Sequence, residues 1–182
     1  MKYIAIKILA MLLLTMHANS QEQTPVKPLP LTASSQTESH YPNLKEIEWL
    51  IGTWEDQAED VTILVNGQWD KYKNFILQHF EWKVEDRDEL ELKQIIGWDP
   101  IQQKIRSWVF DSDGGFGEGL WTKVNDQWHV KMIYTLPDGR KGSATNVYAK
   151  NDNNSYSFSS FGREIDGEVL PNIKPTKLTK KQ

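Results

Sequence analysis

Cysteine is absent from all 182 residues of the chain. This absence excludes disulfide bonds, thiol redox chemistry and the attachment of a lipid to a cysteine behind a leader. The fold must therefore be held together by the burial of apolar side chains and by hydrogen bonds alone.

Basic residues are in deficit and histidine is scarce. The chain has 21 lysines and arginines against 25 acidic residues, which argues against a nucleic-acid partner. Of its four histidines, only His79 and His129 fall on predicted strands, and neither belongs to a spacing such as His-Glu-x-x-His. We therefore predict no metal site and no cofactor.

Long apolar runs are missing except at the amino terminus. The first residues read MKYIAIKILAMLLLTMHANSQ, with Lys2 and Lys7, an apolar run over 8–14, and small residues at 18 and 20. This pattern predicts a cleaved secretory signal over 1–20 and export to the periplasm or the extracellular medium. A short membrane anchor is the alternative, but the run is below the ~20 residues that span a bilayer. We predict no transmembrane segment after cleavage.

The residues that follow divide into a lead-in and one domain. Residues 21–43 are rich in proline, serine, threonine and glutamine, which predicts a disordered lead-in or tether. The folded domain is predicted over 44–182. It opens on a short helix, because Asn43 can cap its start, apolar residues recur at helical spacing, and Gly52 ends it.

The rest of the domain has the signature of β-structure. Strand-length runs are separated by short turns that join neighbours in sequence. Such a chain predicts an all-β fold, an antiparallel up-and-down barrel of about 9–10 strands with one short amino-terminal helix. The predicted strands lie at 53–58, 60–68, 73–84, 88–98, 103–110, 117–124, 127–135, 141–150 and 154–162.

Strand alternation suggests which side chains line an interior. In residues 104–110, Ile105, Ser107 and Val109 share one face, and Arg106 shares the other with aromatic rings. Arg106 could neutralise an anion inside a cavity or pack on a ring at the rim. The eight tryptophans could fill a barrel or line a pocket. The candidate ligand-binding residues are Arg106, Trp108, Phe110, Trp82, Trp98, Trp121, Trp128, Tyr134, Asn146 and Phe158, with Glu118 and Arg163 added at the open end.

The segment FDSDGGFGEG, residues 110–119, places three carboxylates among four glycines. An EF-hand would need further oxygen ligands and a glutamate at its twelfth position, where this chain has Thr122, so that site is excluded. Asp111, Asp113 and Glu118 could form a carboxylate pair across a corner. The segment is best interpreted as a hairpin, which either borders the open mouth of the barrel or forms a corner at its closed end.

Several motifs resemble a known family. The stretch Glu48-Trp-Leu-Ile-Gly-Thr-Trp54 resembles the opening of lipocalin-like, or calycin, barrels. Gly97-Trp-Asp-Pro, the aspartate-rich corner, Leu136-Pro-Asp-Gly and residues 163–168 resemble uncharacterised bacterial lipocalin-like domains that often follow a ketosteroid-isomerase-like domain. The resemblance implies a small barrel with a helix near one mouth and Trp54 packed across the closed base. It implies no catalytic residue.

Together these observations predict an exported barrel that binds a small hydrophobic or amphipathic molecule, whose anionic group Arg106 could neutralise. The first alternative is a small enzyme of the isomerase or hydrolase type, with an interior acid paired to arginine or histidine. The second is a solid barrel that acts as an envelope interaction module, which predicts no cavity of the ~300 Å³ usual for ligands. A haem barrel related to nitrobindins would need His79 or His129 on its inner wall.

Overall fold

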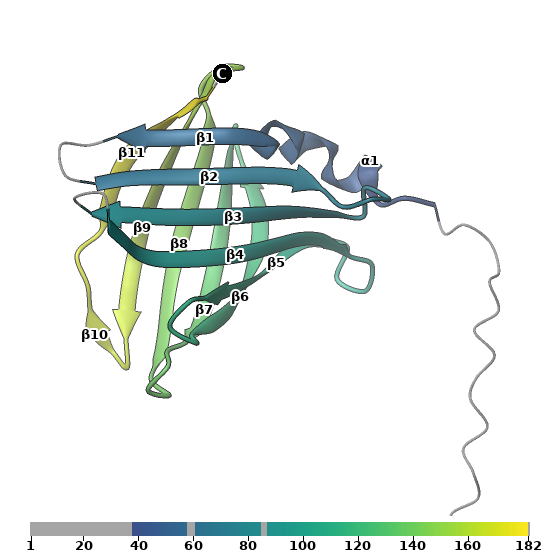
Figure 1. Cartoon of the computed structure of the whole chain (residues 1–182). Coiled ribbons are helices and arrows are strands. Elements are labelled where there is room, and N and C mark those ends of the chain that lie inside the picture. Colours follow the sequence, from purple (N-terminus) through teal and green to yellow (C-terminus); the bar gives the residue numbers. More distant parts are fainter. Residues whose placement is uncertain (1–37, 58–60, 85–86, 182) are drawn as a thin grey trace, which may run out of the picture. The chain divides into compact units, whose positions relative to one another are not determined.

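The computed structural model describes residues 38–57, 61–84 and 87–181 (Figure 1). The predicted signal at 1–20 and most of the predicted lead-in lie outside the described residues. The first described helix begins three residues earlier than the predicted domain boundary.

A short helical segment precedes the strands. It consists of the α-helix α1 (Tyr41–Leu44) and the 3-10 helix η1 (Lys45–Leu50). The predicted cap, Asn43, lies inside α1, because Pro42 opens the first turn instead. Leu44, Ile47 and Leu50 are fully buried, so this segment covers one end of the barrel. No helix in the described residues is long and apolar enough to cross a membrane.

The strands close into an antiparallel barrel of ten strands, which confirms the predicted fold class. Neighbours in sequence pair from β1 to β9, and β11 pairs with both β9 and β1. Figure 1 shows β1–β4 crossing in front of β6–β9. The strands are β1 (Gly52–Gln57), β2 (Val61–Trp69), β3 (Phe75–Val84), β4 (Arg87–Asp99), β5 (Lys104–Asp111), β6 (Phe116–Val124), β7 (Gln127–Thr135), β8 (Lys141–Lys150), β9 (Ser155–Ile165), β10 (Glu168–Val169) and β11 (Ile173–Lys180).

Every predicted strand overlaps one of the first nine observed strands, but β11 was not predicted from the sequence. Its sequence, IKPTKLTK, contains a proline and only one buried side chain, Leu178. The two-residue β10 pairs with the end of β9 and stands outside the ring of ten. β11 is the strand that joins β9 to β1 and so removes both free edges of the sheet.

The helical end of the barrel is joined to the sheet at Leu50. The indole nitrogen of Trp54 donates a hydrogen bond of 3.2 Å to the carbonyl oxygen of Leu50. The Trp54 ring is 1% exposed and meets Tyr156 edge-on, with ring centroids 5.0 Å apart. This is the position across the closed base that the family resemblance implied for Trp54.

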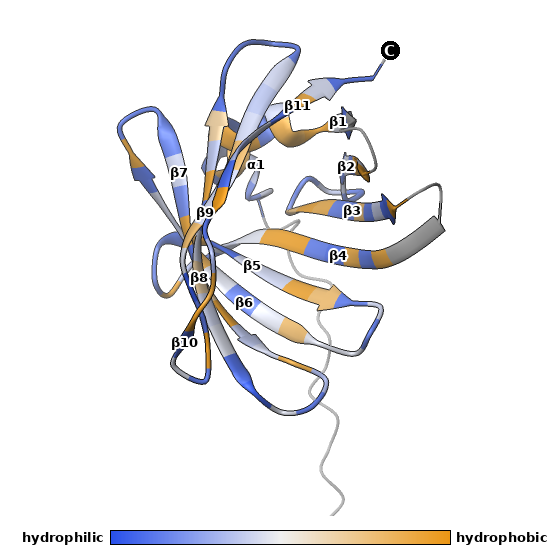
Figure 2. Ribbon diagram, turned by 90° about the vertical axis from the view of Figure 1, so that its left-hand side faces the viewer, coloured by the Kyte–Doolittle hydropathy of each residue, from blue (hydrophilic) through white to orange (hydrophobic). Residues whose placement is uncertain are grey.

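Alternation along the strands separates an inner from an outer face. Figure 2 shows apolar and polar segments alternating along β4, β5 and β6. In β5, Ile105, Ser107 and Val109 are buried, whereas Phe110 is half exposed. The inner face of β5 is therefore the face that sequence reasoning did not choose.

Gly67 on β2 provides a test of the contact between the helical segment, at Leu50, and the barrel. A methyl group at this position would overlap the carbonyl oxygen of Leu50. Because backbone atoms would have to move, we expect Gly67→Ala to lower the free energy of unfolding by about 3 kcal/mol, the upper end for overpacking. Urea denaturation followed by tryptophan fluorescence measures this change.

Gly142→Ala is the matched control, because a methyl group there meets its neighbours at 3.4 Å or more. We expect this variant to stay within about 1 kcal/mol of the parent. Equal losses for the two variants would contradict the close approach of Leu50 to Gly67.

Candidate ligand-binding cavity

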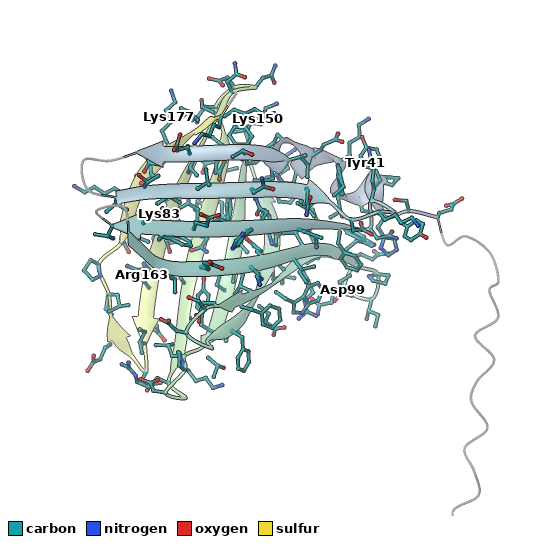
Figure 3. The ribbon with its side chains drawn as sticks, in the orientation of Figure 1. Tyr41, Lys83, Asp99, Lys150, Arg163 and Lys177 are labelled. Carbon is teal, nitrogen blue, oxygen red and sulfur yellow. The ribbon has the colours of Figure 1, made fainter. Side chains whose placement is uncertain are left out.

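A cavity of about 390 Å³ occupies the barrel interior. Its lining includes the turn residues Gly115 and Leu136, which lie at the end of the barrel opposite the helical segment. We call this end the mouth. Figure 3 shows Arg163, another lining residue, on the side away from Tyr41 and Asp99. The helical segment therefore covers one end of the barrel, and the cavity reaches the other.

The cavity wall is predominantly apolar. Aliphatic and aromatic side chains from strands all around the barrel contribute to it. These residues are Ile63, Val65, Phe80, Trp82, Leu92, Val109, Met132, Phe158 and Leu178. Such a wall suits an apolar molecular body, since placing it there removes apolar surface from water.

Tyrosines from β7, β8 and β9 add polar groups to one side of the wall. The amide of Asn146 donates to the hydroxyl of Tyr134 over 3.4 Å, and both residues line the cavity. Burial raises the pKa of Tyr148 and of Tyr156 far above the ordinary tyrosine value. Both of these tyrosines also line the cavity.

Two buried glutamines lie on another part of the barrel, on the neighbouring strands β3 and β4. Gln78 and Gln94 are direct cross-strand neighbours and are 3% and 4% exposed. Gln94 lines the cavity. The side-chain oxygen and nitrogen of Gln78 are both buried without a hydrogen-bond partner among the described residues. Such groups are uncommon in folded proteins, because each costs the free energy of its lost hydration.

The aspartate-rich segment is a hairpin at the mouth. Asp111 and Phe116 line the cavity beside Gly115. The carboxylate of Asp111 accepts backbone hydrogen bonds from Asp113 at 3.0 Å and Gly115 at 2.7 Å. Asp111 therefore holds the turn, and of the two positions left open by the sequence, the hairpin takes the one at the mouth.

Five of the twelve predicted ligand-binding residues line the cavity. They come from β3, β7, β8 and β9, where the residues of the chosen face are directed inward. They are Trp82, Tyr134, Asn146, Phe158 and Arg163.

Four other predicted residues lie on the outer face of the barrel. The guanidinium of Arg106 pairs with Asp99 at 3.1 Å and with Glu118 at 2.6 Å. It also lies 5.7 Å from the ring centroid of Trp108. Phe110 is on the same outer face of β5. The arginine therefore packs on a ring and carries two ion pairs, and it is remote from the cavity lining.

The last three predicted residues are tryptophans in or against the core. Trp121 is 2% exposed, donates to Ser107 at 3.0 Å and stacks on Tyr148 with centroids 5.1 Å apart. Trp98 and Trp128 pack against the same core from partly buried positions. These rings fill the barrel between the cavity and its helical end.

Chemistry based on histidine or paired carboxylates finds no support in this geometry. His79 contacts Glu91 on the outer face, and His129 lies against the exposed ring of Phe161. Neither can offer a haem ligand from the inner wall. Among the described residues, no group of three potential metal ligands occurs. Glu118 is outside the barrel, while Asp111 borders the cavity, so these carboxylates do not meet.

Sequence reasoning missed the glutamine pair and most of the aliphatic wall. The signal was present, since Ile76, Gln78, Phe80 and Trp82 alternate along β3 with the outward Leu77 and His79. Alternation by itself does not say which face of a strand is inside, and glutamine is a residue type that is mostly exposed.

Gln78→Met tests the state of the buried carboxamide. Methionine has a similar shape and no group that needs a hydrogen bond, so we expect the free energy of unfolding to rise by about 1–2 kcal/mol. Gln68→Met on the exposed outer side of β2 is the control and should change stability by less than about 0.5 kcal/mol. A clear loss of stability in the Gln78 variant would show that its amide is well bonded.

The buried tyrosines predict a fall in stability at alkaline pH. Both states are protonated below pH ~10, but above it the unfolded chain loses its tyrosine protons first, because burial raises the folded-state pKa. The free energy of unfolding should therefore decrease as pH rises above 10. Tyr148→Phe should make this decrease shallower by up to ~1.4 kcal/mol per pH unit. Urea denaturation at pH 9 to 11 measures it, and Tyr72→Phe, at an exposed position, should leave the slope unchanged.

Comparison with known proteins supports the architecture. No protein-family model matches the sequence, and no curated protein matches it. Among solved structures, the chain is similar to Rv2717c from M. tuberculosis, with a TM-score of 0.55 and 11% sequence identity. The alignment covers 78% of this chain and 98% of that one. At this identity the likeness concerns the fold alone, which is an antiparallel barrel compatible with a lipocalin-like arrangement.

Proposed function

We propose that this chain is an exported barrel that binds one small hydrophobic or amphipathic molecule in its interior. The observation that carries the proposal is the cavity of about 390 Å³ with its predominantly apolar wall. This volume falls in the ~300–1,000 Å³ range of ligand sites. A barrel that served only as an interaction module would have its interior filled with side chains.

The residues at the mouth favour an amphipathic ligand that carries an anionic group. Arg163 lines the cavity there, and its guanidinium donates to the carbonyl of Pro171 at 2.7 Å. This bond holds the cation beside the opening, where a carboxylate or phosphate of a bound molecule would gain a charge-assisted hydrogen bond. The neighbouring acids Asp111 and Glu164 would restrict such a group to the vicinity of Arg163.

Binding without catalysis agrees best with the residues of the wall. The described carboxylates that line the cavity, Asp111 and Glu164, lie near its mouth, and Asp111 is committed to the turn. The strand histidines are on the outer face. The interior acid paired with arginine or histidine that an isomerase or hydrolase would use is therefore not found among the described lining residues.

Export and membership of the lipocalin-like family complete the proposal. The leader pattern at 1–20 supports export, and the motifs from Glu48 to Trp54 support the family, together with the barrel itself. Native mass spectrometry of the protein purified from its own host would test both the cleavage of the leader and the retention of a ligand. We expect a mature chain beginning at Gln21 that retains a small apolar molecule.

A cavity-filling substitution tests the location of binding. Ala144 lines the cavity on β8, whereas Thr145 follows it on the outer face. We expect Ala144→Phe to weaken binding of an apolar fluorescent probe, N-phenyl-1-naphthylamine, by about tenfold or more, because the ring occupies the space of the probe. Fluorescence titration provides the dissociation constants.

Thr145→Phe is the matched control and should bind the probe as the parent does. Circular dichroism would confirm that both variants keep the barrel. The same affinity in both variants, or no binding by the parent, would contradict an interior binding site.

A further inference from the structure

The glutamine pair, Gln78 and Gln94, lies below the apolar part of the cavity wall. Next to Gln94 on the inner face of β4 are Leu92, toward the mouth, and the fully buried Ile96, toward the helical end. Gln78 faces Gln94 across the strands and also neighbours Gly67, over which Leu50 lies. Gln94 is therefore at the inner end of the cavity wall, and Gln78 lies directly beside it on β3.

The carboxamide of Gln78 is in an unusual state for a buried group. Both its oxygen and its nitrogen lack a hydrogen-bond partner among the described residues. The residue is only 3% exposed, so bulk water does not replace that partner. Cβ atoms of direct cross-strand neighbours are about 4.5–5.5 Å apart, so the amides of the two glutamines can reach one common group. A hydrogen-bonding atom placed between them would recover the lost hydration of these buried groups.

The charge of the wall restricts what that group can be. Among the described lining residues, the charged side chains are Asp111, Arg163 and Glu164, all near the mouth. An ion at the inner end would have no opposite charge beside it, and the burial of an unpaired ion is very costly. A carboxamide, by contrast, both donates and accepts, which suits a neutral hydroxyl, carbonyl or amide.

We infer that the glutamine pair binds an uncharged hydrogen-bonding group at the inner end of the ligand and selects such ligands over pure hydrocarbons. The inference rests on the proposed interior binding and adds the chemical class of the ligand. The bound molecule would be polar at its inner end and apolar along its middle, where Phe80, Leu92 and Met132 line the cavity. Gln78 and Gln94 are thus specificity-determining residues.

A pair of matched probes tests this selection. 2-Naphthol and 2-methylnaphthalene share one ring system and differ by a hydroxyl in place of a methyl group. Dissociation constants of both probes are measured at neutral pH, by quenching of protein fluorescence, for the parent and for the double variant Gln78→Met, Gln94→Met. We expect the ratio of the two constants to shift by about tenfold toward 2-methylnaphthalene in the double variant, because the polar partners of the hydroxyl are gone.

The control is the double variant Gln68→Met, Gln127→Met, in which two exposed glutamines of β2 and β7 receive the same change. It should keep the ratio of the parent, and Gln94→Met alone should give a smaller shift in the same direction. If both probes bind and the inner double variant keeps the parent ratio, the inference fails while interior binding stands. If neither probe binds the parent, or if Ala144→Phe leaves both affinities unchanged, the proposed function fails.

Discussion

The contact of Leu50 with the barrel is the constraint on which the rest of the structure depends. Its carbonyl oxygen accepts the indole hydrogen of Trp54 and lies so close to Gly67 that no side chain fits there. An unpaired carbonyl buried at this place would cost free energy, and Trp54 removes that cost. The helical segment can therefore cover one end of the barrel, and the cavity extends to the opposite end.

The rings behind this junction determine how deep the cavity is. Trp54 meets Tyr156, and Trp121 stacks on Tyr148, with a hydrogen bond from its indole to Ser107. Large aromatic side chains fill the helical half of a ten-stranded barrel, which small side chains would leave partly empty. Both Tyr148 and Tyr156 also line the cavity, so the same residues that complete the core form part of the binding wall.

The inner wall is apolar with polar groups placed at particular depths. Arg163 borders the mouth, tyrosines and Asn146 line one side, and Gln94 lines the inner end with Gln78 beside it. The outer face carries the ion pairs of Arg106 with Asp99 and Glu118. The interior thus supplies hydrogen-bonding groups for a neutral ligand group, and its charges stay near the opening.

The sequence by itself determined the all-β class, nine strands, the single helix and the hairpin at residues 111–115, because alternation and turn residues are local properties of the chain. It also shows that Ile105, Ser107 and Val109 share one face of β5 and Arg106 and Trp108 the other. Only the tertiary structure decided which face is inside, since a strand has no interior until the barrel closes. Closure depends on β11, whose residues carry little apolar signal because only Leu178 is buried there. The position of Gln78 opposite Gln94, and with it the inner end of the cavity, was likewise settled by strand register between residues sixteen positions apart.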